Sequence, residues 1–312
     1  MAERNLIALK LVLAHIIIPA GLTFAFYLIL NVDYLLFAIT QTYLCILFLT
    51  GYWEFFSSLF KKLFFLLVEL ILFIILINKF ITSSNANPNV LLVLILLSIQ
   101  VCLTFLLFKI IIVIFKKEKK SLEIAFPLRD GRYLITDGGN SKISRLMNYH
   151  FYSPIHRKNK TNKSMQFAVD IVKLGSNRKK FIPKKNEAYP VFGEKVYCPI
   201  KGQIIKVENN IDDNEPFIGT YPYNTGNTVV IKNASKYFLL GHLKKGSILV
   251  STGQLVNTGD LIGQIGNSGY SERPHLHMQL IESDSDNFWF GTGVSVQFKG
   301  RNLFKNRVVI IN

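Results

Sequence analysis

Cysteine is scarce in this sequence, and acidic residues are scarce in its first third. The 312 residues include three cysteines, Cys45, Cys102 and Cys198, which lie far apart. This spacing excludes both a disulfide framework and a metal site built on paired cysteines. Half of the residues are hydrophobic, and 36 Lys and Arg stand against 20 Asp and Glu, for a formal charge of +16. This apolar content excludes a disordered chain, because disordered chains contain too few apolar residues to form a buried core.

Charge is nearly absent from residues 1–116, which carry seven basic and four acidic side chains. A helix needs about 20 apolar residues to cross a bilayer core, and helices of soluble proteins are apolar on one face only. The long apolar runs of this segment are apolar all round, and the second reaches the required length only when it is extended to Trp53. We therefore predict that residues 1–116 form an α-helical transmembrane domain of about four spans, in contact with the lipid bilayer. The runs are Leu6–Leu30, Tyr34–Leu49, Leu63–Ile81 and Val90–Phe115.

The basic residues of the loops predict an orientation for these spans. Arg4 lies at the N-terminus, Lys61 and Lys62 lie in the second loop, and a basic run from Lys116 to Lys120 follows the fourth span. The first and third loops have almost no basic residues. By the positive-inside rule, the N-terminus and the C-terminal part of the chain are then cytoplasmic.

From residue 117 onward the chain carries 29 basic and 16 acidic residues. Such a surface favours anionic partners, among them wall polymers and membrane headgroups. Nucleic acid is not favoured as a partner, because the basic segment Lys173–Asn186 lacks a repeated interleaving of basic and aromatic residues. Short runs of Val, Ile, Tyr and Phe, broken by Gly, Asn, Asp or Pro, are typical of a β-rich domain, and we predict one over residues 117–312. The expected strands are Arg132–Thr136, Gln166–Val172, Lys195–Cys198, Gly202–Val207, Thr228–Lys232, Tyr237–His242, Leu261–Ile265 and His275–Ile281.

The triplet His275-Leu276-His277 is the first candidate for chemistry. Alternate residues of a strand share a face, so both imidazoles are expected to point the same way. One of them can bind a divalent metal while the other is free to move protons. Two structural histidines explain the triplet as well.

The sequence around this triplet resembles a known family. Residues 266–277, GNSGYSERPHLH, are similar to the signature GxxGxSxxPHLHF of the lysostaphin-type, or LytM-like, zinc metallopeptidases, which cut peptide cross-links of peptidoglycan. Further similarity is found in YFLLGHL at 237–243, in the Val/Gly hairpins at 250–266 and in VYCPIKG at 196–202, where Cys198 replaces an alanine. The resemblance covers roughly residues 121–281. It implies an all-β, two-sheet peptidase domain, a bound Zn²⁺ and a peptidoglycan peptide substrate.

The resemblance also implies three zinc ligands, namely the His and Asp of an HxxxD motif and the second His of HLH. The matching residues here are Gln166, Asp170 and His277, with Gln166 and Asp170 expected on one face of a strand. A glutamine carbonyl is a much poorer zinc ligand than imidazole. Either the site is weak or another group completes it. His150 is the preferred substitute, because a residue ahead of the strand can fold back into the missing position, and His156 is the second choice.

Two more histidines receive roles from the resemblance. His275 is expected to act as general base on a zinc-bound water, and His242 is expected to stabilise the oxyanion. A non-enzymatic scaffold or activator of wall hydrolysis stays open, since Gln166 departs from the ligand pattern. Lipoyl- and biotinyl-carrier barrels share the hairpin spacing, but they need an exposed lysine at a hairpin tip, and they leave Asp170 unexplained.

The predicted substrate and the predicted orientation conflict. Peptidoglycan lies outside the membrane, whereas the loop charges place the β-rich domain inside. An odd number of spans, an exception to the charge rule or a cytoplasmic peptide substrate would each remove the conflict. We favour an extracytoplasmic domain on a multi-pass anchor in the cell membrane.

Overall fold

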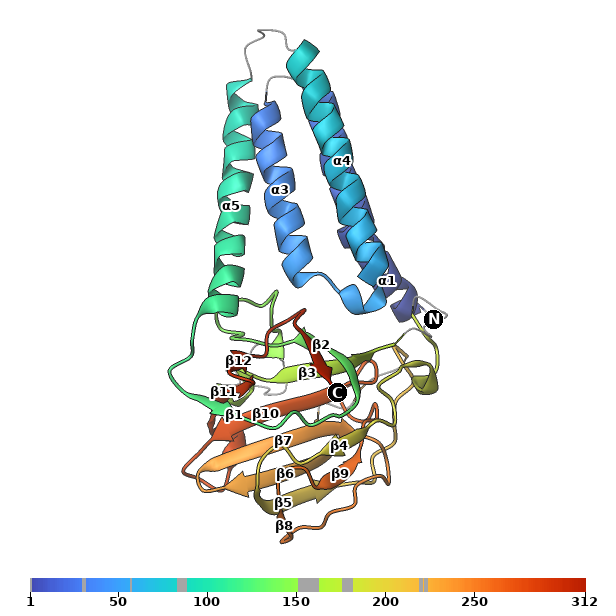
Figure 1. Ribbon diagram of the computed structural model, residues 1–312, viewed down its shortest axis with the longest axis vertical. Coiled ribbons are helices and arrows are strands. Elements are labelled where there is room, and N and C mark those ends of the chain that lie inside the picture. Colours follow the sequence, from blue (N-terminus) through green and yellow to red (C-terminus); the bar gives the residue numbers. More distant parts are fainter. Residues whose placement is uncertain are drawn as a thin grey trace. The chain divides into compact units, whose positions relative to one another are not determined.

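The computed structural model describes residues 2–29, 32–56, 58–82, 89–150, 163–175, 182–218, 221 and 224–312. Its contacts divide the chain between Ile111 and Ile112 into two compact units. The first unit is helical and the second is rich in strands (Figure 1).

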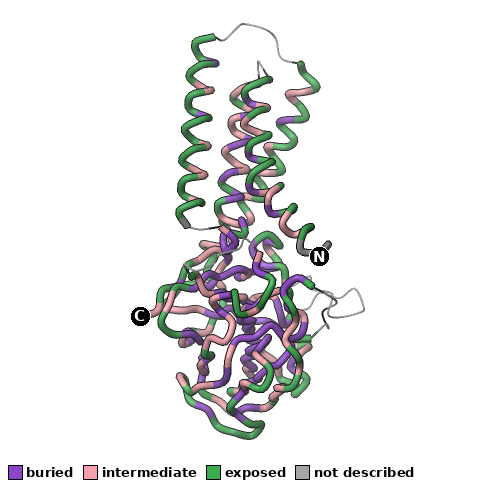
Figure 2. The backbone as a smooth tube through the Cα atoms, turned by 90° about the vertical axis from the view of Figure 1, so that its right-hand side faces the viewer, coloured by how far each residue is buried: buried purple, intermediate pink, exposed green. Residues whose placement is uncertain are grey.

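Four helical stretches of the described residues are long and apolar enough to cross a membrane. They coincide with the four runs predicted from the sequence, and the second stretch, Asp33–Thr50, is the shortest. Large apolar side chains such as Leu66, Phe73 and Phe80 are exposed along them, and exposed positions follow the helices throughout (Figure 2). Such surfaces suit contact with lipid, since soluble monomers rarely expose large apolar patches. The helices are α1 (Ala2–Val12), the π-helical turn η1 (Leu13–Ile17), α2 (Ile18–Leu28), α3 (Asp33–Thr50), η2 (Trp53–Phe55), α4 (Ser58–Thr82) and α5 (Val90–Phe115).

The helices of the first unit pack through a shared apolar core. Phe26 of α2, Leu36 of α3, Leu72 of α4 and Leu96 of α5 are buried together. Because lipid tails are as apolar as these side chains, close packing and interhelical hydrogen bonds hold such bundles together.

Antiparallel pairing dominates the second unit. Among the described residues, eleven strands form one sheet and β4 and β9 form a second, so the predicted all-β, two-sheet domain is confirmed. The main path of the large sheet is β13-β2-β3-β10-β7-β6-β5-β8, and β11 pairs with β10, β12 and, in parallel, β1 (Figure 1). The strands are β1 (Ser121–Glu123), β2 (Gly131–Asp137), β3 (Val169–Leu174), β4 (Lys195–Tyr197), β5 (Gly202–Glu208), β6 (Asn227–Asn233), β7 (Lys236–Leu243), β8 (Leu255–Val256), β9 (Leu261–Gln264), β10 (Leu276–Glu282), β11 (Thr292–Phe298), β12 (Arg301–Asn302) and β13 (Val308–Ile311).

The central strands of this sheet are buried on both faces. On β7, Phe238 and Leu240 enter the main core, whereas Tyr237 and Leu239 pack on the other face with Phe288. Full burial of a large apolar side chain contributes about 1.5–3 kcal/mol to stability. The strands β3, β10 and β7, which lie side by side, therefore form a rigid base for the side chains that they carry.

Two of the predicted strands, those containing Asp170 and His277, begin later than predicted. Lys163–Met165 form a short 3₁₀ helix, and the Ala168 amide donates to the Met165 carbonyl at 3.0 Å. β3 consequently begins at Val169, so Gln166 and Asp170 do not share a strand. β10 begins at Leu276, one residue after His275.

Candidate metal centre

Sheet register brings Asp170 and His277 together. Asp170 lies on β3 and His277 on β10, and the two residues are direct partners across this antiparallel pair. Such partners have Cβ atoms about 4.5–5.5 Å apart. Accordingly, His277 Nδ1 lies 2.9 Å from Asp170 Oδ1.

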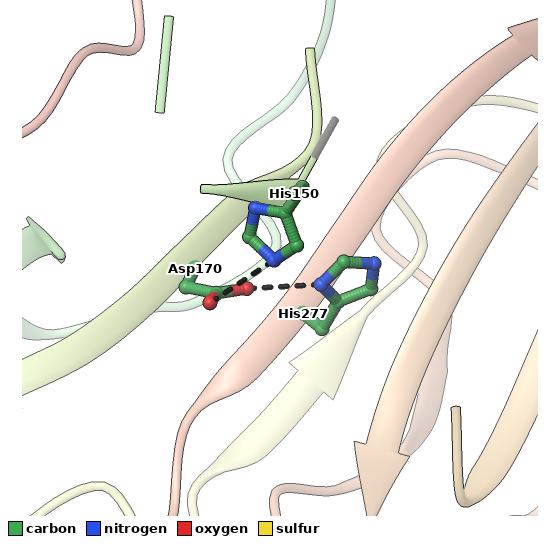
Figure 3. A group of neighbouring side chains, drawn as sticks. All are labelled: His150, Asp170 and His277. Carbon is green, nitrogen blue, oxygen red and sulfur yellow. Dashed lines mark hydrogen bonds and ion pairs between the residues drawn. The ribbon is translucent and has the colours of Figure 1, made fainter. Parts of the chain in front are cut away.

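His150 reaches the same place from an irregular segment. It lies after β2, and its Nε2 atom is 3.3 Å from Asp170 Oδ2. Its ring centroid lies 4.9 Å from that of His277. The candidate ligand atoms of His150, Asp170 and His277 all lie within 4.8 Å of one another. Figure 3 shows the three side chains turned toward one another. The side chains of His150 and Asp170 keep 14% of their surface exposed, against 2% for His277, so the first two are partly accessible to solvent.

This group fits a zinc ion by its chemistry. Two imidazoles and one carboxylate are a ligand set that zinc accepts, with a fourth position left open. Burial raises the pKa of Asp170, but the charges of His150 and His275 and hydrogen bonds from His150 and His277 more than offset this and hold it well below its usual range. Asp170 is thus ionised at neutral pH, as a metal ligand must be. For His150, burial lowers the pKa, but the carboxylates of Asp170 and Asp137 together outweigh burial and the net shift is upward.

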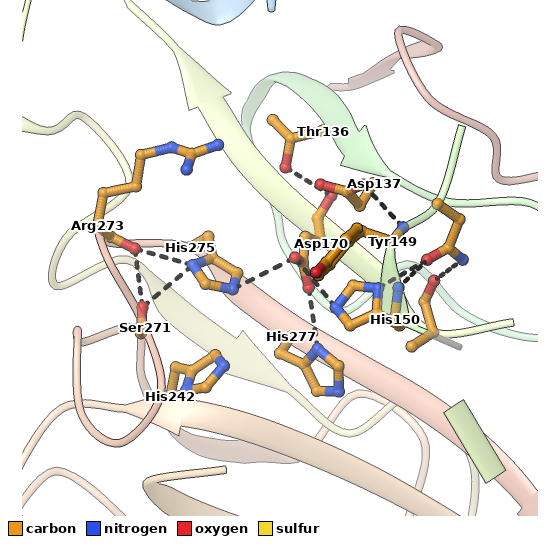
Figure 4. Close-up of polar contacts among 12 residues, drawn as sticks. Thr136, Asp137, Tyr149, His150, Asp170, His242, Ser271, Arg273, His275 and His277 are labelled. Carbon is orange, nitrogen blue, oxygen red and sulfur yellow. Dashed lines mark hydrogen bonds and ion pairs between the residues drawn. The ribbon is translucent and has the colours of Figure 1, made fainter. Parts of the chain in front are cut away.

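His275 and His242 lie beside the group (Figure 4). His275 Nε2 is 3.5 Å from Asp170 Oδ2. The His242 ring centroid is 4.7 Å from that of His275 and 5.5 Å from that of His277. Both imidazoles of the HLH triplet therefore face Asp170 as predicted, although His275 immediately precedes β10.

Backbone carbonyls set the tautomers of these two histidines. His275 Nδ1 lies 2.8 Å from the Arg273 carbonyl oxygen, and His242 Nδ1 lies 2.8 Å from that of Ser268. A carbonyl oxygen only accepts, so Nδ1 carries the proton in both rings and Nε2 carries a lone pair. Burial lowers the pKa of His275, and it lowers that of His242 well below its ordinary value with help from the neighbouring imidazoles. Both rings are therefore neutral near pH 7 and can accept a proton at Nε2.

The backbone of His242 is strained. Its φ is +58°, in the left-handed region that costs energy for a residue with a side chain. Its amide donates to the Thr225 carbonyl at 2.8 Å, and its carbonyl accepts from the Gly266 amide at 2.9 Å. Backbone strain of this kind concentrates at functional sites.

A family model matches this part of the chain. Residues 188–288 match Peptidase family M23. The β-rich unit carries a peptidase M23 domain. The matched segment includes His242, His275 and His277, and the predicted lysostaphin and LytM-type resemblance is confirmed. His150 and Asp170 precede the matched segment.

Curated relatives of the chain include an endopeptidase and an endolysin. The chain is 36% identical over 94 residues to the peptidoglycan DD-endopeptidase ShyA of Vibrio cholerae, covering 30% of this chain and 19% of that protein. It is 44% identical over 66 residues to Endolysin 2638A of Staphylococcus phage 2638A, covering 20% of this chain and 14% of the endolysin. The chain thus spans less than a fifth of the length of each of these two relatives.

Solved structures with partial similarity include two peptidases. A zinc containing peptidase from Vibrio cholerae is 23% identical with a TM-score of 0.32, covering 54% of this chain and 37% of that one. The catalytic domain of lysostaphin from Staphylococcus simulans is 21% identical with a TM-score of 0.27, covering 42% of this chain and 75% of that one.

Gln166, which stands in place of the family's first histidine, has polar partners of its own. Its side-chain Nε2 donates to Asn140 Oδ1 at 3.0 Å, and its backbone carbonyl accepts from the Ser141 hydroxyl at 2.8 Å. Of the two substitutes considered, His150 is brought to Asp170, whereas His156 lies outside the described residues.

Three polar residues around the M23 site were missed by the sequence analysis. Asn148 Oδ1 lies 2.8 Å from His150 Nδ1, Gln279 Oε1 lies 3.1 Å from His277 Nε2, and Ser271 Oγ lies 3.2 Å from His275 Nδ1. Gln279 was detectable, because it follows His277 by two residues on a predicted strand and so shares its face. Asn148 and Ser271 lie in irregular segments, where spacing predicts no common face.

Proposed function

We propose that this protein is a membrane-anchored zinc metalloendopeptidase that cleaves the peptide part of bacterial peptidoglycan. The observation that carries the proposal is the convergence of His150, Asp170 and His277 beside two neutral imidazoles whose Nε2 atoms hold lone pairs. The M23 domain supports peptidase chemistry, and its similarity to a peptidoglycan DD-endopeptidase supports the substrate class.

The side chains divide the work between metal binding and proton transfer. His150 through Nε2, Asp170 through its carboxylate and His277 through Nδ1 would hold the zinc. When bound, zinc supplies a Lewis acid for the scissile carbonyl and lowers the pKa of a water toward ~7. His275 then accepts the proton of the attacking water at Nε2, while its Nδ1–H stays on the Arg273 carbonyl.

His242 has a narrower role than the sequence predicts. Its neutral tautomer presents a lone pair at Nε2, because its Nδ1–H is held by the Ser268 carbonyl. A donor to an oxyanion must carry a proton at that atom. In this proposal His242 donates to the oxyanion only when its Nε2 carries a proton.

The scaffold alternative rested on Gln166. His150 Nε2 lies 3.3 Å from Asp170 Oδ2, so a second imidazole is available to the site. This weakens the argument that Gln166 leaves the site without enough ligands. We therefore place the enzyme ahead of the scaffold.

Cleavage of sacculi tests the activity. The full-length protein in detergent is loaded with zinc and incubated with intact peptidoglycan, and released fragments are identified by mass spectrometry. We expect chelator-sensitive release of wall peptides that returns when zinc is added back. A zinc-loaded protein that releases no peptide from sacculi would contradict the proposed activity.

The proposed site of action is the outer side of the cell membrane. The four apolar helices support anchoring, and the surplus of basic residues from 117 onward fits an anionic envelope. Cys198 is a poor probe of sidedness, because it is 1% exposed and burial raises the pKa of its thiol to about 11.

A new exposed cysteine tests sidedness. Leu255 is 78% exposed, so Leu255→Cys, with Cys45 and Cys102 changed to serine, offers a reactive thiol on the β-rich unit. We expect a membrane-impermeant maleimide to label it in intact cells. Labelling only after the cells are broken open would place the unit in the cytoplasm, as the loop charges predict.

A further inference from the structure

Asn148 is fully buried, and its side-chain amide is engaged at both ends. Its exposed fraction is 0%. Its Nδ2 group donates to the carbonyl oxygens of Gly139 and Ala168, each at 2.8 Å. Its Oδ1 atom lies 2.8 Å from His150 Nδ1 and accepts the His150 backbone N–H at 3.1 Å.

These contacts determine which way the amide faces. Backbone carbonyl oxygens only accept, so the two hydrogens of Nδ2 must point at Gly139 and Ala168. A flipped amide would set its own oxygen against two carbonyl oxygens. Oδ1 therefore faces His150 Nδ1, and that ring nitrogen must carry the proton.

The tautomer of His150 follows from this. With the proton on Nδ1, a neutral His150 holds its lone pair on Nε2, the atom that lies 3.3 Å from Asp170 Oδ2. A histidine that binds a metal through one nitrogen commonly donates its other N–H to a fixed acceptor, which sets both tautomer and ring orientation. Asn148 supplies that acceptor.

Asn148 also ties two parts of the fold together. His150 lies on the segment after β2, outside the strands that the structure describes. Ala168, which accepts from Asn148, immediately precedes β3, the strand of Asp170. One side chain thus fixes the His150 segment to the strand that carries another candidate ligand.

The orientation of the Gln279 amide beside His277 is less well determined. Gln279 Oε1 lies 3.1 Å from His277 Nε2, but Gln279 Nε2 has no hydrogen-bond partner in the described part of the chain. Nothing there prevents this amide from turning over. His277 is oriented instead by its strand, which pairs with β3 and β7.

We propose that Asn148 is a positioning residue, which holds His150 in the tautomer and orientation that present Nε2 to a metal at Asp170 and His277. It allows a histidine outside the sheet to serve where Gln166 stands in place of a ligand. This inference rests on the metal site of the proposed function and is independent of the bond that the enzyme cleaves.

A double-mutant cycle on metal affinity tests the inference. Zn²⁺ and Co²⁺ affinities of the full-length protein in detergent are measured by competition with a chromophoric chelator for the wild type, Asn148→Ala, His150→Ala and the double variant. We expect Asn148→Ala to weaken binding about 10–100-fold, the usual cost of removing such a support. In the His150→Ala background, Asn148→Ala should weaken metal binding less than about threefold. The effects of two substitutions are not additive when one residue acts through the other.

Two further variants separate positioning from folding. Gln166→Ala removes another amide of the same region, whose nitrogen contacts Asn140, and should leave metal affinity unchanged. Asn148→Asp keeps an acceptor for His150 Nδ1 but loses both donor bonds and buries a charge. We expect Asn148→Asp to lower the Tm of the metal-free protein more than Asn148→Ala does. We nevertheless expect it to bind Co²⁺ more tightly than Asn148→Ala does, with the wild-type absorption spectrum. If Asn148 had a purely structural role, the variant with the lower Tm would also have the lower metal affinity.

The outcomes distinguish this inference from the proposed function. An equal loss of affinity from Asn148→Ala in both backgrounds overturns the role of Asn148 and leaves the peptidase intact. The predicted cycle in a protein that cleaves no peptidoglycan supports Asn148 and overturns the peptidase. A wild-type protein that binds neither metal overturns both.

Discussion

His150→Ala is expected to release the metal from this protein. Removing the imidazole takes away one of three candidate ligands, so zinc affinity should fall by more than the roughly 100-fold that loss of a supporting residue costs. The carboxylate of Asp170 and one imidazole would remain, which is too few for a stable protein zinc site. Competition titration with a chelator and zinc content after dialysis measure the loss.

Gln166→Ala is the matched control for His150→Ala. It removes the side chain that stands at the family's ligand position but whose amide nitrogen contacts Asn140. Zinc affinity is expected to stay close to that of the wild type. The assignment of His150 would be wrong if Gln166→Ala released the metal and His150→Ala retained it.

His275→Ala is expected to abolish turnover while zinc stays bound. The ring lies outside the group formed by His150, Asp170 and His277, and its Nε2 lone pair is held ready by the Nδ1 contact with Arg273. Loss of a general base typically lowers the rate about 10²–10⁴-fold. Rates of peptide release from sacculi, together with zinc content of the same samples, provide the measurement.

The two readouts of His275→Ala are informative together. Cleavage at the wild-type rate would remove His275 from the proton transfer. Loss of zinc along with activity would instead make His275 a ligand. Only zinc retained with slow cleavage agrees with the proposed role.

Much of the fold is predictable because its signals are local. Apolar runs of about 20 residues mark the helices, and short runs rich in Val, Ile, Tyr and Phe that are bounded by polar residues mark β6 and β7. The start of β3 was not predicted correctly. The segment from Gln166 to Ala168 follows a 3₁₀ helix held by local hydrogen bonds, which compete with the extended conformation.

The sequence indicated which residues belong to the candidate site better than it indicated how they are arranged. Asp170 and His277 are separated by 107 positions, and their pairing depends on which strands become neighbours. No residue pattern near His150 indicates that it folds back to Asp170, because that path runs through an irregular segment tied by Asn148. The three-dimensional fold was therefore required to show that His150 reaches Asp170, whereas His156 lies outside the described residues.

The division of the centre between sheet and irregular segment has a consequence for how such proteins diversify. Asp170 and His277 are fixed by the pairing of central strands, where a shift of one residue would turn every side chain to the other face. Segments between strands tolerate insertion and rerouting at little cost. The third candidate ligand, His150, is thus the member whose position along the chain is least constrained. Surveys that demand a fixed spacing between the first His and the Asp will pass over such proteins, whereas a search for the spatial arrangement will find them.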